Sequence, residues 1–144
     1  MTYKIEIIEN QAEDIIVSAK SRTDILDKIE TLLELQQEEL FGFTNSETVR
    51  LNGGEVYAFI VEAGKVYALT EKDKWQLKER LYQLEEQYTK GFVKINQSCL
   101  VNISKIERFQ SSIGGSLSVI LKNGYRDYIS RRQLRVVKER MGLL

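Results

Sequence analysis

The sequence predicts an α+β protein that is mostly β, with short helices, preceded by a small β-β-α extension. Short alternating or β-branched runs recur along the 144 residues, and Gly-containing dipeptides separate several of them. Only three stretches carry apolar residues at helical spacing, near 23–40, 73–88 and 130–141. We place the extension at residues 1–40 and the main β domain at residues 41–144.

The extension combines two predicted strands, 3–8 and 14–19, with a helix that begins near Thr23. Ser21 or Thr23 can cap this helix, and Asp24 and Asp27 favour its N-terminal end. An apolar stripe of about five turns follows. It is suited either to packing on the rest of the chain or to pairing with a second copy.

The segment 41–70 is rich in strand residues, and two dipeptides predict hairpin turns, Asn52-Gly53 and Ala63-Gly64. Residues 70–73 then resemble a capping box, with Asp73 in the place of Glu or Gln. They predict a helix whose inward face comprises Trp75, Leu77, Leu81, Leu84 and Tyr88.

Two further signals lie near the C-terminal end. Asn123-Gly124 predicts a hairpin with a two-residue type I′ turn, in which both central residues have positive φ. Ser130 and Gln133 form the ends of a capping box, which predicts a last helix to about Met141.

The stretch 91–106, GFVKINQSCLVNISKI, is the least ordinary part of the chain. Its apolar ends are typical of buried strands, but three neutral polar residues interrupt it, Asn96, Gln97 and Ser98. Alternation cannot bury all three, because neighbouring side chains of a strand point to opposite faces.

Composition excludes several kinds of site. With no His and one Cys, Cys99, the chain cannot form a Ser-His-Asp or Cys-His catalytic set, and zinc is disfavoured. No phosphate-binding glycine motif occurs, so we expect no enzyme activity, no metal and no cofactor. Without a secretory signal or a run of 18 apolar residues, the sequence is typical of a cytoplasmic protein.

Charge is divided unevenly along a chain whose net charge is zero. Residues 1–90 carry 11 Lys and Arg against 18 Asp and Glu, whereas residues 91–144 carry 10 against 3. A basic segment of this kind is suited to a polyanion, or else it is a solvated surface balanced by the acidic half. Two arginines in the first turn of the last helix, Arg131 and Arg132, oppose the helix dipole and favour a phosphate ligand.

These features together resemble the LytTR DNA-binding domain family, over about residues 42–144. The signature around the polar break and the Asn-Gly turn followed by a Ser-Arg pair carry the resemblance. The matching residues are Phe92, Lys94, Ile95, Ser98, Leu100, Val101, Asn102, Ile106, Asn123, Gly124, Ser130 and Arg131. The extension resembles that of members which lack a receiver domain.

The resemblance implies an elongated β domain that inserts inter-strand loops, rather than a recognition helix, into the major groove. The implied base contacts are Lys65, Asn96, Gln97 and Arg131. Amides suit adenine and basic side chains suit guanine. The residues expected at DNA phosphates are Lys94, Ser98, Lys105, Arg126, Arg132 and Arg135. The chain departs from the family where His is usual, at Asn96, and where an aromatic is usual, at Cys99.

The expected partner is therefore double-stranded DNA, bound at repeated half-sites, with a second copy on the DNA and a homodimer as an open alternative. The resemblance also implies a membrane-protein inhibitor. Two other classes stay open, a protein-interaction module without nucleic-acid binding and an RNA-binding domain. The charges of residues 1–40 further suggest that this segment covers the basic face in a resting state.

Overall fold

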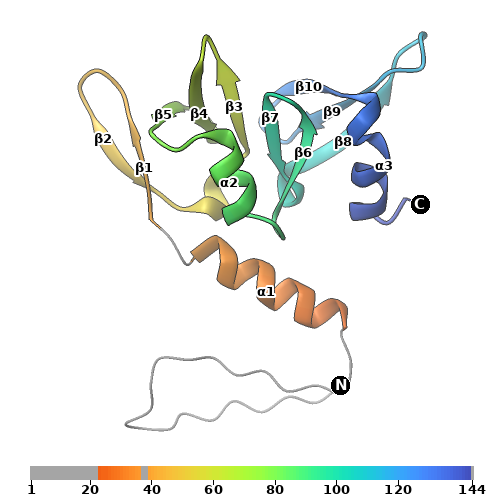
Figure 1. The fold of residues 1–144 in the computed structure, drawn as a ribbon, viewed down its shortest axis with the longest axis horizontal. Coiled ribbons are helices and arrows are strands. Elements are labelled where there is room, and N and C mark those ends of the chain that lie inside the picture. The colour runs from red at the N-terminus through yellow and green to blue at the C-terminus, as the bar shows by residue number, and fades with distance from the viewer. Residues whose placement is uncertain (1–22, 37–38, 144) are drawn as a thin grey trace, which may run out of the picture.

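The computed structural model describes residues 23–36 and 39–143, and it confirms the predicted mostly β class. Two antiparallel sheets stand side by side, with strand orders β2-β1-β5-β4-β3-β7-β6 and β10-β9-β8 (Figure 1). The elements in chain order are α1 (Asp24–Gln36), β1 (Leu40–Phe43), β2 (Thr48–Leu51), a 3-10 helix (Gly53–Glu55), β3 (Ala58–Glu62), β4 (Lys65–Leu69), β5 (Lys74–Leu77), α2 (Leu81–Gln87), β6 (Phe92–Asn96), β7 (Cys99–Asn102), a second 3-10 helix (Ile103–Lys105), β8 (Ile106–Ser111), β9 (Leu117–Leu121), β10 (Arg126–Ile129) and α3 (Arg131–Arg140).

Strand β7 lies between two apolar clusters, because its side chains alternate between them. Leu100 belongs to the cluster on the side of α2, whereas Cys99 and Val101 belong to the cluster that includes Val137 of α3. The first cluster contains three aromatic rings with centroids 4.9–5.5 Å apart, Phe59, Tyr88 and Phe92. Each large apolar side chain buried there contributes about 1.5–3 kcal/mol. Burial on both faces therefore holds the β6–β7 hairpin firmly.

The predicted first helix is confirmed as α1, while the predicted strands 3–8 and 14–19 lie outside the described residues. Thr23 Oγ1 accepts a hydrogen bond from the Leu26 amide at 3.3 Å, as a capping residue does. Helix α1 packs near the first 3-10 helix, and Glu30 forms an ion pair of 3.7 Å with Lys90. The division of the chain at residue 40 stays a prediction.

The hairpin at Ala63-Gly64 is confirmed, and the one at Asn52-Gly53 is not. Ala63 and Gly64 have φ of 50° and 75° and join β3 to β4, as a two-residue turn requires. Asn52 instead begins a 3-10 turn, and its side chain accepts a hydrogen bond from the Gly54 amide at 2.8 Å. Strand β2 pairs with β1 rather than with β3, so Asn52-Gly53 is a connection between hairpins.

The helix predicted from residue 73 begins later, at Leu81. Residues 70–73 form a tight turn between β4 and β5, in which Thr70 Oγ1 accepts a hydrogen bond from the Asp73 amide at 3.2 Å. The same side-chain bond occurs in a capping box, so the local pattern did not distinguish the two. Trp75 lies in β5 opposite Ala68, and pairing between strands overrides the helical spacing.

The hairpin at Asn123-Gly124 is confirmed, but its turn is not type I′. Only Gly124 has a positive φ, 89°, while Asn123 uses its side chain to accept from the Tyr125 amide at 3.0 Å. The loop is thus a turn followed by one left-handed glycine. Helix α3 begins after Ser130 as predicted, although the Ser130 side chain makes no capping hydrogen bond.

Candidate nucleic-acid interface

The polar break of residues 96–98 is the tip of the β6–β7 hairpin. Asn96 pairs with Cys99, which leaves Gln97 and Ser98 as an exposed two-residue turn. The pairing of β6 with β7 shifts between Lys94 and Asn96, so a bulge precedes the turn. The break therefore ends one strand and starts the next, and it presents two polar side chains to solvent.

Asn96 itself is 2% exposed. Its side-chain oxygen accepts from the Ser98 amide at 2.9 Å, and its nitrogen donates to the Tyr128 carbonyl at 2.9 Å and to Asp127 Oδ1 at 3.2 Å. The carboxamide is thus engaged inside the protein. Of the two predicted amide contacts, the structure places Gln97 on the surface and Asn96 beneath it.

The β3–β4 hairpin lies beside this turn. Ile60 pairs with Cys99, and the Val61 amide donates to the Ser98 carbonyl at 2.9 Å. Because β3 ends at Glu62, its hairpin tip comes to the same end of the sheet as Ser98. Lys65 follows that tip directly and is exposed.

The start of α3 reaches the same place from the second sheet. The Ser130 amide donates to the Ile95 carbonyl at 2.8 Å, which fixes the helix N-terminus against the end of β6. Arg131 and Arg132 follow and are exposed. Residues 63–65, 97–98 and 130–132 thus form one edge of the domain, the upper edge in Figure 1, and we name it the loop edge.

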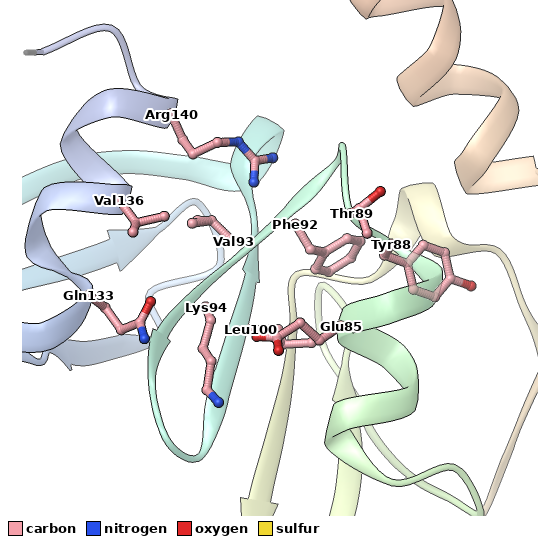
Figure 2. Close-up of a pocket in the computed structure, with 10 residues that line it drawn as sticks. All are labelled: Glu85, Tyr88, Thr89, Phe92, Val93, Lys94, Leu100, Gln133, Val136 and Arg140. Atoms are coloured by element: carbon pink, nitrogen blue, oxygen red, sulfur yellow. The ribbon is translucent and has the colours of Figure 1, made fainter.

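Three further residues predicted at phosphates are exposed or partly exposed near this edge. Ser98 is in the turn itself, and Arg135 is on the exposed side of α3, where it bonds Glu139 at 3.1 Å. Lys94 is half-buried on β6, and Figure 2 shows its side chain running along the hairpin toward the turn. It lines a groove between α2 and α3 together with Val136 and Arg140.

The structure does not bring Lys105 and Arg126 to the loop edge. The Lys105 carbonyl accepts from the Lys122 amide at 2.9 Å, next to the β9–β10 turn at the other end of the strands. Its ammonium lies 4.9 Å from the centroid of the Tyr57 ring, in a hollow that also contains Glu55, Glu71 and Asp73. Arg126 begins β10 at the end away from Ser130.

A partly buried polar cluster lies behind the loop edge. Asp127 accepts from the Tyr125 hydroxyl at 3.0 Å, and Cys99 is fully buried beside them. Burial, and then the negative charge of Asp127, raise the pKa of the Cys99 thiol well above its ordinary value. Burial likewise raises the pKa of the Tyr125 hydroxyl. Both groups stay protonated at neutral pH, and a protonated buried thiol is a poor nucleophile.

The acidic helix α1 does not cover the loop edge. It lies along the opposite side of the domain, below the sheets in Figure 1. Its described residues therefore leave the loop edge open, while residues 1–22 of the segment expected to cover the basic face lie outside the described residues. Across residues 23–36 and 39–143, no helix is long and apolar enough to cross a membrane.

The geometry defines a class of protein, a mostly β domain in which two turns and a helix N-terminus form one polar edge. Residues 46–142, more than half of the chain, match the LytTr DNA-binding domain family, and the chain belongs to that family. This is a family of DNA-binding domains rather than of enzymes.

Relatives and a solved structure agree with this membership. Uncharacterized HTH-type transcriptional regulators of Staphylococcus aureus strains NCTC 8325 and COL are each 32% identical over 139 residues, covering 96% of this chain and 89% of the relative. A LytTr DNA-binding domain from Bacillus cereus has the same fold, with a TM-score of 0.68 and 17% identity, covering 73% of this chain and 98% of that chain.

The term HTH, for helix-turn-helix, is part of the names of those relatives. The described part of this chain has a different order of helices and strands. Helix α1 is followed by strands, and α2 is separated from α3 by β6 to β10. No two helices of residues 23–36 and 39–143 are therefore consecutive, as a helix-turn-helix requires. Of the predicted base contacts, Gln97 lies in a turn, Lys65 directly follows one, and Arg131 begins α3.

Proposed function

We propose that this protein is a transcriptional regulator that binds a specific site in double-stranded DNA through its loop edge. The convergence of three segments, far apart in sequence, at one exposed edge carries the proposal. Membership of the LytTr DNA-binding domain family supports it, as do the S. aureus relatives described as transcriptional regulators. We place the protein in the bacterial cytoplasm, where chromosomal DNA is.

We assign base recognition to Gln97, Arg131 and Lys65. The Gln97 amide can form a bidentate pair with adenine N6 and N7, and Arg131 or Lys65 can bind guanine O6 and N7. Each good pair is worth about 1–3 kcal/mol of discrimination against a wrong base. Turns that carry these side chains are narrow enough to enter the major groove, which also admits a two-stranded ribbon.

Phosphate contacts fall to Lys94, Ser98, Arg132 and Arg135, which flank the three base-contacting residues. They position the domain on the duplex without specifying its sequence. Backbone amides at the N-terminus of α3 add a partial positive charge at the same place.

Three residues that the sequence placed at DNA, Asn96, Lys105 and Arg126, are not assigned to the interface in this proposal. Asn96 supports the turn from inside instead of contacting a base, because its carboxamide is engaged by three internal hydrogen bonds. Lys105 and Arg126 lie away from the loop edge, and Lys105 is balanced by neighbouring acids. Lys105 and Arg126 are therefore assigned to the solvated surface rather than to DNA phosphates.

One loop edge presents one set of base-contacting residues, which suits one half-site. We therefore propose that two copies occupy a repeated site. A second binding step, with a stoichiometry of two proteins per duplex, is the expected outcome of a titration. A duplex that carries one half-site should bind one copy only. Control by a membrane-protein inhibitor stays a prediction from the family resemblance.

Selection of duplexes from a random pool, followed by affinity measurements over a range of salt, tests the proposal. The three cations Lys94, Arg132 and Arg135 predict a slope of about −3 in log affinity against log salt for each copy. The proposal requires an enriched sequence together with that steep slope. A flat slope or an unenriched pool would favour a protein-interaction module, and tighter binding to single-stranded RNA would favour an RNA-binding domain.

A further inference from the structure

We propose that the hydrogen-bonded group formed by Asn96, Asp127 and Tyr125 sets the sequence specificity of the protein without touching DNA. In this view the group holds the β6–β7 turn and the start of α3 at a fixed separation. Gln97 and Arg131 then meet their bases together. The inference rests on the proposed function, because it concerns how the loop edge is positioned.

Asn96 fixes the turn in two ways at once. Its side-chain oxygen accepts from the Ser98 amide at 2.9 Å, two residues along, and this Asx-type bond sets the shape of the turn. Its side-chain nitrogen donates to Asp127 Oδ1 at 3.2 Å and to the Tyr128 carbonyl at 2.9 Å. One side chain therefore shapes the turn and anchors it to β10.

Asp127 carries the connection toward α3. One of its carboxylate oxygens accepts from Asn96 and from the Tyr128 amide at 2.8 Å, and the other accepts from the Tyr125 hydroxyl at 3.0 Å. Because Asp127 lies three residues before Ser130, holding the carboxylate also holds the strand that leads into α3. The Ser130 amide completes the connection through its bond to the Ile95 carbonyl at 2.8 Å.

The chain offers a matched control at the other end of β7. Asn102 is 1% exposed, donates to the Val56 carbonyl at 2.9 Å and accepts from the Ser104 amide at 3.1 Å. It is therefore as buried and as engaged as Asn96, yet it lies at the edge away from Gln97. Loss of either carboxamide should cost similar stability, whereas only Asn96 should matter for specificity.

The chain also contains its own reporter. Cys99 is the only cysteine, is fully buried and follows the turn directly. A thiol reagent reaches it only when the β6–β7 turn opens or the whole protein unfolds. The labelling rate, compared with the rate of global unfolding, thus measures how firmly the turn is held.

The test uses the full-length chain and two duplexes of equal length, one selected from a random pool and one scrambled. For Asn96→Ala, we expect the ratio of specific to non-specific affinity to fall about ten-fold, the order of one lost base contact. For Asn102→Ala, the ratio should stay within about two-fold of wild type, since no base-contacting segment moves. Cys99 in Asn96→Ala should label faster than global unfolding allows.

Tyr125→Phe keeps the test decisive if Asn96→Ala does not fold, because it removes one hydroxyl and nothing else. It should lower the ratio by about three-fold, within the range of one ordinary hydrogen bond, because Asp127 keeps its hydrogen bonds from Asn96 and from the Tyr128 amide. An unchanged ratio in every one of these two variants that folds would overturn the inference, and so would an equal loss in Asn102→Ala. If Asn96→Ala changes the preferred base while Tyr125→Phe does nothing, Asn96 contacts DNA directly. A wild-type ratio near one would instead reject the proposed function itself.

Discussion

Replacing Gln97 by Ala should erase a base preference while leaving the fold intact. Gln97 is exposed in a two-residue turn, and its side chain makes no hydrogen bond to any described residue. Nothing in the folded protein therefore depends on its carboxamide. Exposed substitutions of this kind change stability by about 0.5 kcal/mol or less.

The effect on DNA follows from the geometry of one amide–adenine pair. Losing a bidentate pair costs about 1–3 kcal/mol, which corresponds to about 5- to 150-fold in affinity for the preferred base over the others. The loss should be confined to one or two base pairs, because the turn presents a single long side chain. Preferences at positions contacted by Arg131 and Lys65 should persist.

Gln97→Glu sharpens the same prediction. A carboxylate has no donor for adenine N7 but accepts a hydrogen bond from cytosine N4, so the preferred base should change from adenine toward cytosine. Selection from a random pool with wild type, Gln97→Ala and Gln97→Glu compares the three directly. Identical preference profiles for all three proteins would refute the assignment of Gln97 to a base.

Three further predictions concern phosphates, packing and pH. Arg132→Ala should weaken binding to all sequences and reduce the salt slope by about 0.9, whereas Lys105→Ala should leave the slope unchanged; equal effects would contradict the assigned edge. Gly42→Ala would place a Cβ 2.5 Å from the Cβ of Trp75, so urea unfolding should show a loss of about 1–3 kcal/mol; full stability would show that the strands yield freely. Burial raises the pKa of the Cys99 thiol, so the folded state keeps a proton that the unfolded chain loses. Stability should then fall above about pH 8.5, by up to about 1.4 kcal/mol per pH unit, and Cys99→Ala should fall less steeply.

Local sequence patterns predicted the structure correctly where residues close in sequence determine the backbone conformation. Ala63-Gly64 forms the expected hairpin because both residues adopt the positive φ that such turns require. Helix α3 follows Ser130 as expected, and its apolar residues Leu134, Val137 and Met141 all pack in the same cluster.

Local signals failed where distant strands decide the outcome. The pattern around Thr70 and Trp75 suits a helix, but pairing of β5 with β4 and β1 makes it a strand. The segment contains only two apolar residues, Trp75 and Leu77, which are too few to distinguish a helical period from a strand period. Long-range pairing of this kind leaves no mark within the segment itself.

The same limit applies to the candidate site. The sequence signature predicted the same role, a base contact, for Asn96 and Gln97, although Asn96 is buried and Gln97 is exposed. The difference arises from Asp127, which is 31 residues away in the chain and accepts from Asn96. The sequence could identify the polar break, but only the packed strands separate the supporting amide from the exposed one.

The central claim, that the loop edge contacts DNA, is tested most directly by backbone amide chemical shifts. A titration with the selected duplex should perturb residues 63–65, 97–98 and 130–132 most strongly. Residues 53–55, 71–73 and 103–105, at the opposite edge, should shift little. Perturbations concentrated at that opposite edge or along α1 would contradict the claim.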